Sequence, residues 1–237
     1  DIEDSIEMEQ NSLKDMVRKT IFAVSTEEHR PIFTGCLFEI KNNKLNVVAV
    51  DGFRLAWKSK FLQKAANDFS AVIPGRTLNE INKILNDSFD TIKIGVSKNQ
   101  ALFELENCKI VTRLLDGEFL NYASVIPETW ETRIRVDKGS IQNCFERVSL
   151  ISASSIEKEK KYPVKVNVEI GKVTISCTNQ TGDAKEEIFV ETEGKNLEAG
   201  FNPKYFLDAL RAIDDPEVFI DFGSSISPCI IRPTEEN

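Results

Sequence analysis

Apolar and polar side chains alternate over residues 5–8 and again over residues 133–136. Strict alternation is typical of a strand that buries one face, so both segments are predicted to be strands. Each is followed by apolar positions at helical spacing, which predicts an amphipathic helix with a serine, Ser12 or Ser140, as its N-cap. The apolar positions are Leu13, Met16, Val17 and Val24 in the first helix and Ile141, Cys144, Phe145 and Val148 in the second.

A second helix is predicted in each half of the chain, close behind a proline. Pro74 and Pro203 fit a helix start, because the first helical positions have no partner for the backbone N–H that proline lacks. Leu78, Ile81 and Ile84 follow at helical spacing in one half, and Leu207, Leu210 and Ile213 in the other. Further strands are predicted over 36–40, 44–50, 91–96 and 101–105, and over 166–170, 172–178, 218–222 and 228–232.

These elements occur twice in the same order, about 128 residues apart. Ile6 corresponds to Ile134, and Lys44 corresponds to Lys172. A repeat of this length is a duplicated domain rather than a solenoid module. We therefore expect an α+β chain of two similar domains that occupy residues 1–128 and 129–237. The second domain has no counterpart of the apparent strand at 108–114, so its last strand is expected to be missing.

The composition is that of a globular protein with an acidic balance. The 237 residues include 38 Asp and Glu, 30 Lys and Arg and one histidine, which gives a net charge of −8. This charge argues against a protein that coats DNA, but it permits one that touches nucleic acid through a single basic surface. No apolar run is long enough to span a bilayer, and the acidic start of the chain does not resemble a signal peptide.

The cysteines have neither disulfide nor zinc-site spacing. They are expected to be buried free thiols, because each lies among apolar residues and no Cys-x-x-Cys pair occurs. With one histidine and no paired ligands, no metal site and no cofactor is expected. The five residues are Cys36, Cys108, Cys144, Cys177 and Cys229.

Catalytic motifs find little support in the sequence. Asp51-Gly52 and Asp116-Gly117 are typical of turns, and no phosphate-binding loop, nucleophile elbow or His-Glu-x-x-His motif occurs. His29 stands in a polar run, where a solvent-exposed side chain is expected. A hydrolase that uses Asp51 or Asp116 is one alternative, although neither residue has a candidate base beside it.

Four segments resemble parts of the bacterial β sliding clamp family, the processivity subunits of replicative DNA polymerases. They occur in the family's order, and the likeness extends from about residue 6 to 232, which makes it far more specific than one short motif. The segments are 30–39 with Gly-Cys-Leu-Phe-Glu, 50–56 with Asp-Gly-Phe-Arg-Leu-Ala, 114–122 with Leu-Leu-Asp-Gly-Glu-Phe-Leu-Asn-Tyr, and 200–205 with Gly-Phe-Asn-Pro-Lys-Tyr.

The resemblance implies a DNA-clamp fold, with antiparallel sheets outside and two helices inside each domain. It also implies a cytoplasmic, non-catalytic subunit of the DNA polymerase III holoenzyme, which encircles duplex DNA without reading its sequence. Peptides of the polymerase, the clamp loader and repair factors would be its protein partners. The chain matches the family's second and third domains. The full-length subunit is expected to form a homodimeric ring, and this chain alone is expected to be monomeric.

The resemblance also implies a peptide-binding pocket between these two domains. Phe53, Leu120 and Ser124 stand where the family often has histidine, proline and arginine, so a more apolar pocket is expected. From the residues alone, Val50, Leu55 and Val125 could equally be ordinary core. The full set is Phe33, Val50, Gly52, Phe53, Arg54, Leu55, Leu120, Ser124 and Val125 from one domain and Asn202, Tyr205 and Ser227 from the other.

Basic residues on the predicted helices are the candidates for facing DNA. Such residues can hold phosphates without reading bases, although a solvated helix face has the same composition. A scaffold that binds peptides but no DNA is therefore a second alternative. The candidates are Lys14, Arg18, Lys19, Arg76, Lys83, Arg147, Lys204 and Arg211 on helices and Arg30 on a loop.

Overall fold

The computed structural model describes residues 2–153, 163–180 and 182–235. The chain divides into two compact units, Asp1–Tyr122 (unit 1) and Ala123–Asn237 (unit 2). This division falls slightly before residue 128, where the repeat suggested the boundary.

Unit 1 contains two short helices and eight strands among the described residues. Alternating apolar positions form its strands, and helical spacing forms α1 and α2, as the sequence pattern indicated. In chain order the elements are β1 (Asp4–Glu9), α1 (Gln10–Arg18), η1 (Ile21–Ala23), η2 (Pro31–Thr34), β2 (Gly35–Lys41), β3 (Lys44–Val50), β4 (Leu55–Phe61), β5 (Phe69–Pro74), α2 (Gly75–Ile84), β6 (Thr91–Val96), β7 (Gln100–Leu105) and β8 (Cys108–Arg113).

The strands of unit 1 form two antiparallel sheets, in the orders β1-β6-β7-β8 and β4-β3-β2-β5. Phe38 is opposite Val47 in the β2–β3 pair, which places both on the same face. The turn between these strands contains Asn42 and Asn43 with φ of 52° and 59°. A two-residue hairpin turn favours such left-handed conformations, and asparagine tolerates them better than most residues.

Unit 2 repeats this arrangement. Its sheets have the orders β12-β11-β10-β14 and β13-β9-β15-β16, and all neighbours are antiparallel. The elements are η3 (Tyr122–Ser124), which begins at the end of unit 1, β9 (Thr132–Asp137), α3 (Lys138–Ala153), β10 (Val164–Glu169), β11 (Lys172–Asn179), β12 (Gly182–Phe189), β13 (Glu191–Gly194), β14 (Leu197–Phe201), α4 (Pro203–Ala212), β15 (Glu217–Phe222) and β16 (Cys229–Pro233).

The structure confirms the duplication. Strands β1 and β9 begin at residues 4 and 132, α1 and α3 at residues 10 and 138, and β3 and β11 at residues 44 and 172. The two units differ at the sheet edges. Within the described ranges, β7 is flanked by β8 whereas its counterpart β16 is an edge strand, and β13 pairs with the side of β9 that is open in β1.

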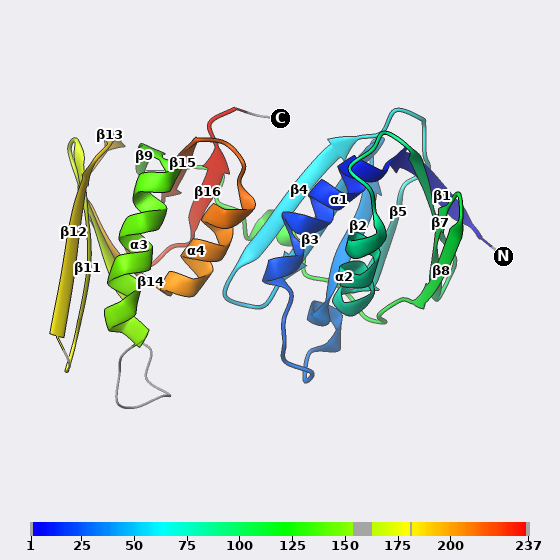
Figure 1. Cartoon of the computed structure of the whole chain (residues 1–237), viewed down its shortest axis with the longest axis horizontal. Helices are drawn as coiled ribbons and strands as arrows, with labels where there is room; N and C mark the ends of the chain where they lie inside the picture. Colours follow the sequence, from blue (N-terminus) through cyan, green and yellow to red (C-terminus); the bar gives the residue numbers. More distant parts are fainter. Residues whose placement is uncertain (1, 154–162, 181, 236–237) are drawn as a thin grey trace. The chain divides into compact units, whose positions relative to one another are not determined.

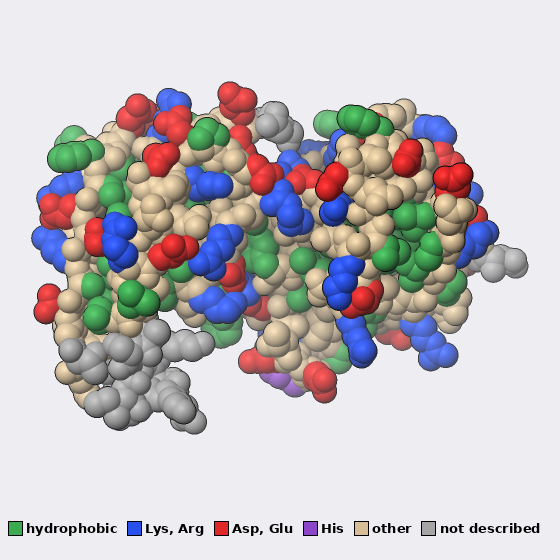
Figure 2. Space-filling view, viewed as in Figure 1, with side chains coloured by type: hydrophobic (Ala, Val, Ile, Leu, Met, Phe, Trp, Pro, Cys, Tyr) green, Lys and Arg blue, Asp and Glu red, His purple; other side chains and the backbone are tan. Residues whose placement is uncertain are grey.

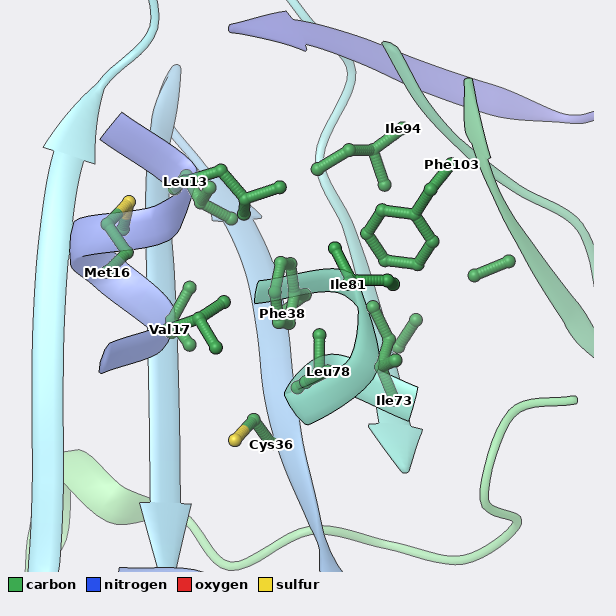
Figure 3. Packing of buried hydrophobic residues seen from close by; sticks show 14 of the residues in the cluster. Leu13, Met16, Val17, Cys36, Phe38, Ile73, Leu78, Ile81, Ile94 and Phe103 are labelled. Carbon is green, nitrogen blue, oxygen red and sulfur yellow. The ribbon is translucent and has the colours of Figure 1, made fainter. Parts of the chain in front are cut away.

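The core of unit 1 lies where its two helices pack against both sheets. Figure 1 shows α1 beside α2, and α3 beside α4. In unit 2, Phe145 of α3 and Phe206 of α4 stack with ring centroids 4.0 Å apart. Truncating a buried phenylalanine typically costs about 3–5 kcal/mol, so such contacts dominate stability. The buried core of unit 1 is drawn in Figure 3 and includes Leu13, Met16, Val17, Phe38, Ile73, Leu78, Ile81, Ile94 and Phe103.

The predicted serine caps are wrong, because both helices begin before these serines. In α3 the cap is Asp137, whose Oδ1 accepts hydrogen bonds from the backbone N–H and the hydroxyl of Ser140, both at 2.7 Å. In α1 the hydroxyl of Ser12 donates to Glu9 Oε2 at 3.2 Å instead of accepting from the backbone. A carboxylate therefore takes the capping position at the start of α3, whereas no side chain caps the start of α1.

Two further expectations about apolar residues are corrected. Val24 does not lie on the face of α1, because the helix ends at Arg18 and a 3-10 turn, η1, follows. Cys108 is exposed at the start of β8, although the cysteines were expected to be buried. Cys36 is buried, and this burial raises the pKa of its thiol to about 12, so it stays protonated and unreactive.

Among the described residues, no helix is both long and apolar enough to cross a membrane. Over the same part of the chain, no group of His, Cys, Asp and Glu side chains is arranged to hold a metal ion.

Candidate functional site

The loop after β3 is fixed by the side chain of Asp51. Its Oδ1 accepts hydrogen bonds from the backbone N–H groups of Phe53 at 2.9 Å and Arg54 at 3.1 Å. Its Oδ2 pairs with Arg54 Nε at 3.0 Å, and Arg54 Nη2 donates to the carbonyl of Phe22 at 2.7 Å. Phe53 protrudes from this turn with 79% of its surface exposed. These bonds fix the backbone of the loop that carries the exposed side chain of Phe53.

A small apolar cluster covers the face of the β4-β3-β2-β5 sheet that points away from the core. Its buried centre is Leu37, Val48 and Val72, one from each of β2, β3 and β5. The partly buried residues packed against it are Ile32, Leu55, Leu115, Phe119 and Tyr122. Three of these belong to residues 114–122, which we call the strap.

Hydrogen bonds and ring contacts hold the strap to unit 1. The backbone N–H of Leu115 donates to the carbonyl of Val72 at 2.9 Å. The ring of Phe119 meets that of Phe33 edge to face, with centroids 5.7 Å apart. The hydroxyl of Tyr122 donates to Glu39 Oε2 at 2.6 Å. The strap is thus fixed near both of its ends.

The pocket residues predicted between residues 33 and 125 differ widely in exposure. Phe53, Val125 and Leu120 expose 79%, 44% and 36% of their surfaces, as a peptide-contacting surface would require. Val50 is only 5% exposed, and it lies on the same face of β3 as Val48, which is part of the outer apolar cluster. Of the remainder, Gly52 and Ser124 are exposed, and Phe33, Arg54 and Leu55 are half-buried.

The three remaining predicted pocket residues lie at the start of α4 and on the loop before β16. Asn202 is the N-cap of α4, and its side chain accepts a hydrogen bond from the backbone N–H of Lys204 at 3.0 Å. Tyr205 is half-buried in the first turn of the same helix. Ser227 lies 2.6 Å from Ser224, hydroxyl to hydroxyl. Two of these three predicted pocket residues, Asn202 and Ser227, are therefore polar, and Tyr205 is the only aromatic one.

The structure also contains a cavity of about 210 Å³ in unit 2, which none of the predicted pocket residues lines. Asp221 lies in its wall and binds Arg133 through two hydrogen bonds of 2.5 and 2.8 Å and Arg232 through one of 3.2 Å. These ion pairs connect β9, β15 and β16. The cavity lining is Pro127, Glu128, Thr129, Trp130, Arg133, Asp221, Gly223, Ile230 and Arg232.

Most of the basic residues predicted to face DNA are paired with acidic ones. On α1, Arg18 and Lys19 both contact Asp15, at 2.8 and 3.0 Å, and Lys14 contacts Asp87 at 3.2 Å. The other helices follow the same pattern: Lys83 with Glu80, Arg147 with Glu186, Lys204 with Asp208, and Arg211 with Glu146.

Arg30 and Arg76 are the exceptions in the predicted set, since neither has an ion pair within the described parts of the chain. Both are exposed. Figure 2 shows Lys and Arg side chains next to Asp and Glu over the face on which the helices are seen. Because most of these cations are paired with carboxylates, weak contacts with phosphates are expected rather than tight binding.

The structure weakens the hydrolase alternative. Asp51 is engaged by two backbone N–H groups and a guanidinium, so its carboxylate serves the turn. His29 is exposed and lies 3.2 Å from Glu27. Asp116 is exposed in a turn before Gly117, whose φ of +129° favours glycine.

Sequence reasoning missed Phe119, Tyr122 and Trp57. The motif of residues 114–122 predicts only Leu120 as a site residue. Tyr122 contacts Trp57, with ring centroids 6.0 Å apart, and both lie on the outer face of the sheet. An aromatic that ends a loop motif and can reach a polar partner was the available signal.

Each unit therefore has the architecture of a clamp domain, with two helices packed against two antiparallel sheets. Residues 7–121 match the family model described as the central domain of the DNA polymerase III beta subunit, and residues 123–237 match its C-terminal domain. The chain belongs to the DNA polymerase III beta subunit family and comprises its central and C-terminal domains.

Individual relatives agree with this assignment. The beta sliding clamp of Staphylococcus epidermidis is 34% identical over 237 residues, which cover 99% of this chain and 62% of that protein. The DNA polymerase sliding clamp of Bacillus subtilis has a TM-score of 0.93 at 32% identity and covers 100% of this chain and 63% of that one. The DNA polymerase III beta subunit of Thermotoga maritima gives 0.92 at 28%, over 100% and 64%. The chain thus spans less than two thirds of these relatives.

Proposed function

We propose that this chain is the peptide-binding and DNA-facing part of a non-catalytic sliding clamp that acts in the cytoplasm. Together with a further domain of the same kind it would close into a homodimeric ring around duplex DNA. The ring would tether the replicative polymerase, the clamp loader and repair factors through short peptides. Processivity would then come from topology rather than from tight contacts with DNA.

The observation that carries this proposal is the match of two consecutive domain models, in order, over nearly the whole chain. A fold alone would not establish function, since one fold hosts many activities. Here the agreement extends to the named sliding clamps at 32–34% identity. Matching loop segments, rather than the core alone, support transfer of the function.

The charges of the helices suit a ring that slides. A protein that holds many phosphates tightly would be slowed on DNA and would be strongly salt-sensitive. In this chain Asp15 offsets both Arg18 and Lys19, while Arg76 stays uncompensated. A few weak, sequence-independent contacts remain, which is what topological retention needs.

The peptide-binding role rests on the exposed apolar surface near the end of unit 1. Phe53 projects from a turn that is fixed before any ligand arrives, and Leu120 projects from the strap. Preorganised apolar side chains bind peptide anchors at low entropic cost. The phenylalanine and leucine at these positions favour anchors that are more apolar than those of the family at large.

Calorimetric titration with a synthetic peptide of the pattern Gln-Leu-x-Leu-Phe tests this role. The proposal predicts saturable binding by this chain, and no binding of a peptide with the same residues in scrambled order. Equal heats for the two peptides would contradict the proposal.

A peptide-binding scaffold that never encounters DNA is the second candidate function. The pairing of most helix cations with carboxylates favours it, because paired cations attract phosphates weakly. The two candidates differ in one result. A clamp requires some salt-dependent association with duplex DNA, whereas a pure scaffold would show none at low ionic strength.

A further inference from the structure

The strap carries an exposed apolar residue between two anchored aromatic ones. Phe119 is anchored by its edge-to-face contact with Phe33, and Tyr122 by its hydrogen bond to Glu39. Leu120 lies between these anchors and exposes 36% of its surface. Because the side chain of Leu120 is exposed, packing around it does little to fix its position. Its position therefore follows that of the strap backbone, which Phe119 and Tyr122 hold on either side.

The Tyr122 hydroxyl is bonded to a charged acceptor. It donates to Glu39 Oε2 at 2.6 Å, a length typical of a strong O–H···O⁻ bond. Burial raises the pKa of Tyr122, and the hydrogen bond and charge of Glu39 raise it further. The phenol therefore remains a donor throughout the physiological pH range.

Glu39 is itself held in place by a short network across the sheet. Asn46, opposite Glu39 in the β2–β3 pair, donates from Nδ2 to Glu39 Oε2 at 3.4 Å. Its Oδ1 accepts from Trp57 Nε1 at 3.0 Å. The network thus runs from β4 through β3 and β2 to the strap, and three strands fix the acceptor that Tyr122 uses.

We propose that Tyr122 is a positioning residue for peptide binding: its hydrogen bond to Glu39 locks the strap and so holds Leu120 ready for a peptide anchor. This inference rests on the proposed peptide-binding function and adds a residue to it. Without the bond the strap would sample other conformations, and the apparent affinity would fall with the fraction in the competent one.

The test compares Tyr122→Phe with the unaltered chain in calorimetric titration with the Gln-Leu-x-Leu-Phe peptide. The substitution removes only the hydroxyl, so the ring contact with Trp57 can persist. A lost bond to a charged group predicts a Kd about tenfold higher. The matched control is Thr77→Val, which loses a half-buried 3.0 Å bond to Thr112, between α2 and β8, and should leave Kd unchanged.

Hydrogen exchange of the Leu115 amide, measured without peptide, gives a second readout of whether the strap is locked. This amide bonds to Val72 within the strap's anchorage, so Tyr122→Phe should speed its exchange while Thr77→Val should not. Glu39→Met removes the acceptor from the other side. If the bond is the cause, the double variant binds peptide no more weakly than either single variant.

The outcomes distinguish a failure of the proposed peptide-binding function from a failure of the proposed role of Tyr122. If the unaltered chain binds no peptide, the proposed function fails. If it binds and Tyr122→Phe binds equally well, or if the effects of Tyr122→Phe and Glu39→Met simply add, the function stands and the role of Tyr122 is refuted. A variant that melts before titration would also refute it, because the role would then be general stability.

Discussion

Asp137 caps α3 by accepting two hydrogen bonds from one residue, Ser140, through a single carboxylate oxygen. The backbone N–H and the hydroxyl of Ser140 both lie 2.7 Å from Oδ1. These two bonds hold the pKa of Asp137 below its ordinary value of 3.8, the hydroxyl contributing most. The start of α3, a helix with one buried face, is thus capped by an exposed carboxylate.

Removing this cap should lower stability in a pH-dependent way. Asp137→Ala is expected to cost about 1 kcal/mol in the free energy of unfolding near neutral pH, whereas Asp137→Asn, which keeps an oxygen acceptor, should cost less. A depressed pKa contributes stability above pH 3.8 that is lost as pH falls through the folded-state value. Urea unfolding at pH 7 and pH 3 should therefore show a smaller difference between the chain and Asp137→Ala at the lower pH.

The exposed aromatic of the fixed turn should contribute directly to peptide affinity. Phe53→Ala removes a largely exposed ring, so folding should change little while peptide binding weakens by about 2 kcal/mol. Phe61 is a suitable control, because it is 68% exposed on β4 of the same unit and outside the predicted pocket. Equal losses for Phe53→Ala and Phe61→Ala in the same titration would remove Phe53 from the site.

Uncompensated arginines should dominate the association with DNA. Arg76→Ala is expected to lower the slope of log affinity against log salt by about 0.9, the value for one phosphate contact. Arg135→Ala is the control, since Arg135 lies on β9 and pairs with Glu217 at 2.5 Å. Fluorescence anisotropy with labelled duplexes of two unrelated sequences gives both slopes. A preference for one sequence would count against the clamp proposal.

The raised pKa of Tyr122 should appear in alkaline unfolding. Its folded-state pKa lies above the ordinary value of 10.0, so the folded chain binds the proton more tightly and this contribution is present below pH 10. It is lost as the pH rises toward the folded-state value. Between about pH 9 and 11 the unaltered chain should lose more stability than Tyr122→Phe, as measured by urea midpoints. Parallel curves would show that Tyr122 titrates normally.

Sequence reasoning located the repeat, because it depends on local periodicity. The strand at Ile6 and its counterpart at Ile134 could be found from alternation alone. Helix starts were missed at Ser12 and Ser140, since an N-cap is decided by competition between neighbouring polar groups. Asp137 precedes Ser140 by one turn and wins the backbone N–H.

The site was harder to predict than the fold. Matching segments identified Phe53 and Leu120, both of which are exposed, whereas Val50, from the same segments, is buried. The partner of Tyr122 is Glu39, more than eighty residues earlier in the chain, and no local pattern connects them. The ion pairs of Arg147 with Glu186 and of Arg211 with Glu146 are likewise long-range, so charge counting overestimated the basic face.

The central claim is that topology retains the protein on DNA, and retention on circular and linear DNA tests it most directly. A complete subunit that includes this chain would be loaded onto nicked circular plasmid by its clamp loader and separated from free protein by gel filtration in high salt. The account predicts that the subunit elutes with the circle and is lost after a single restriction cut. Equal retention on both forms, or none on the circle, would contradict it.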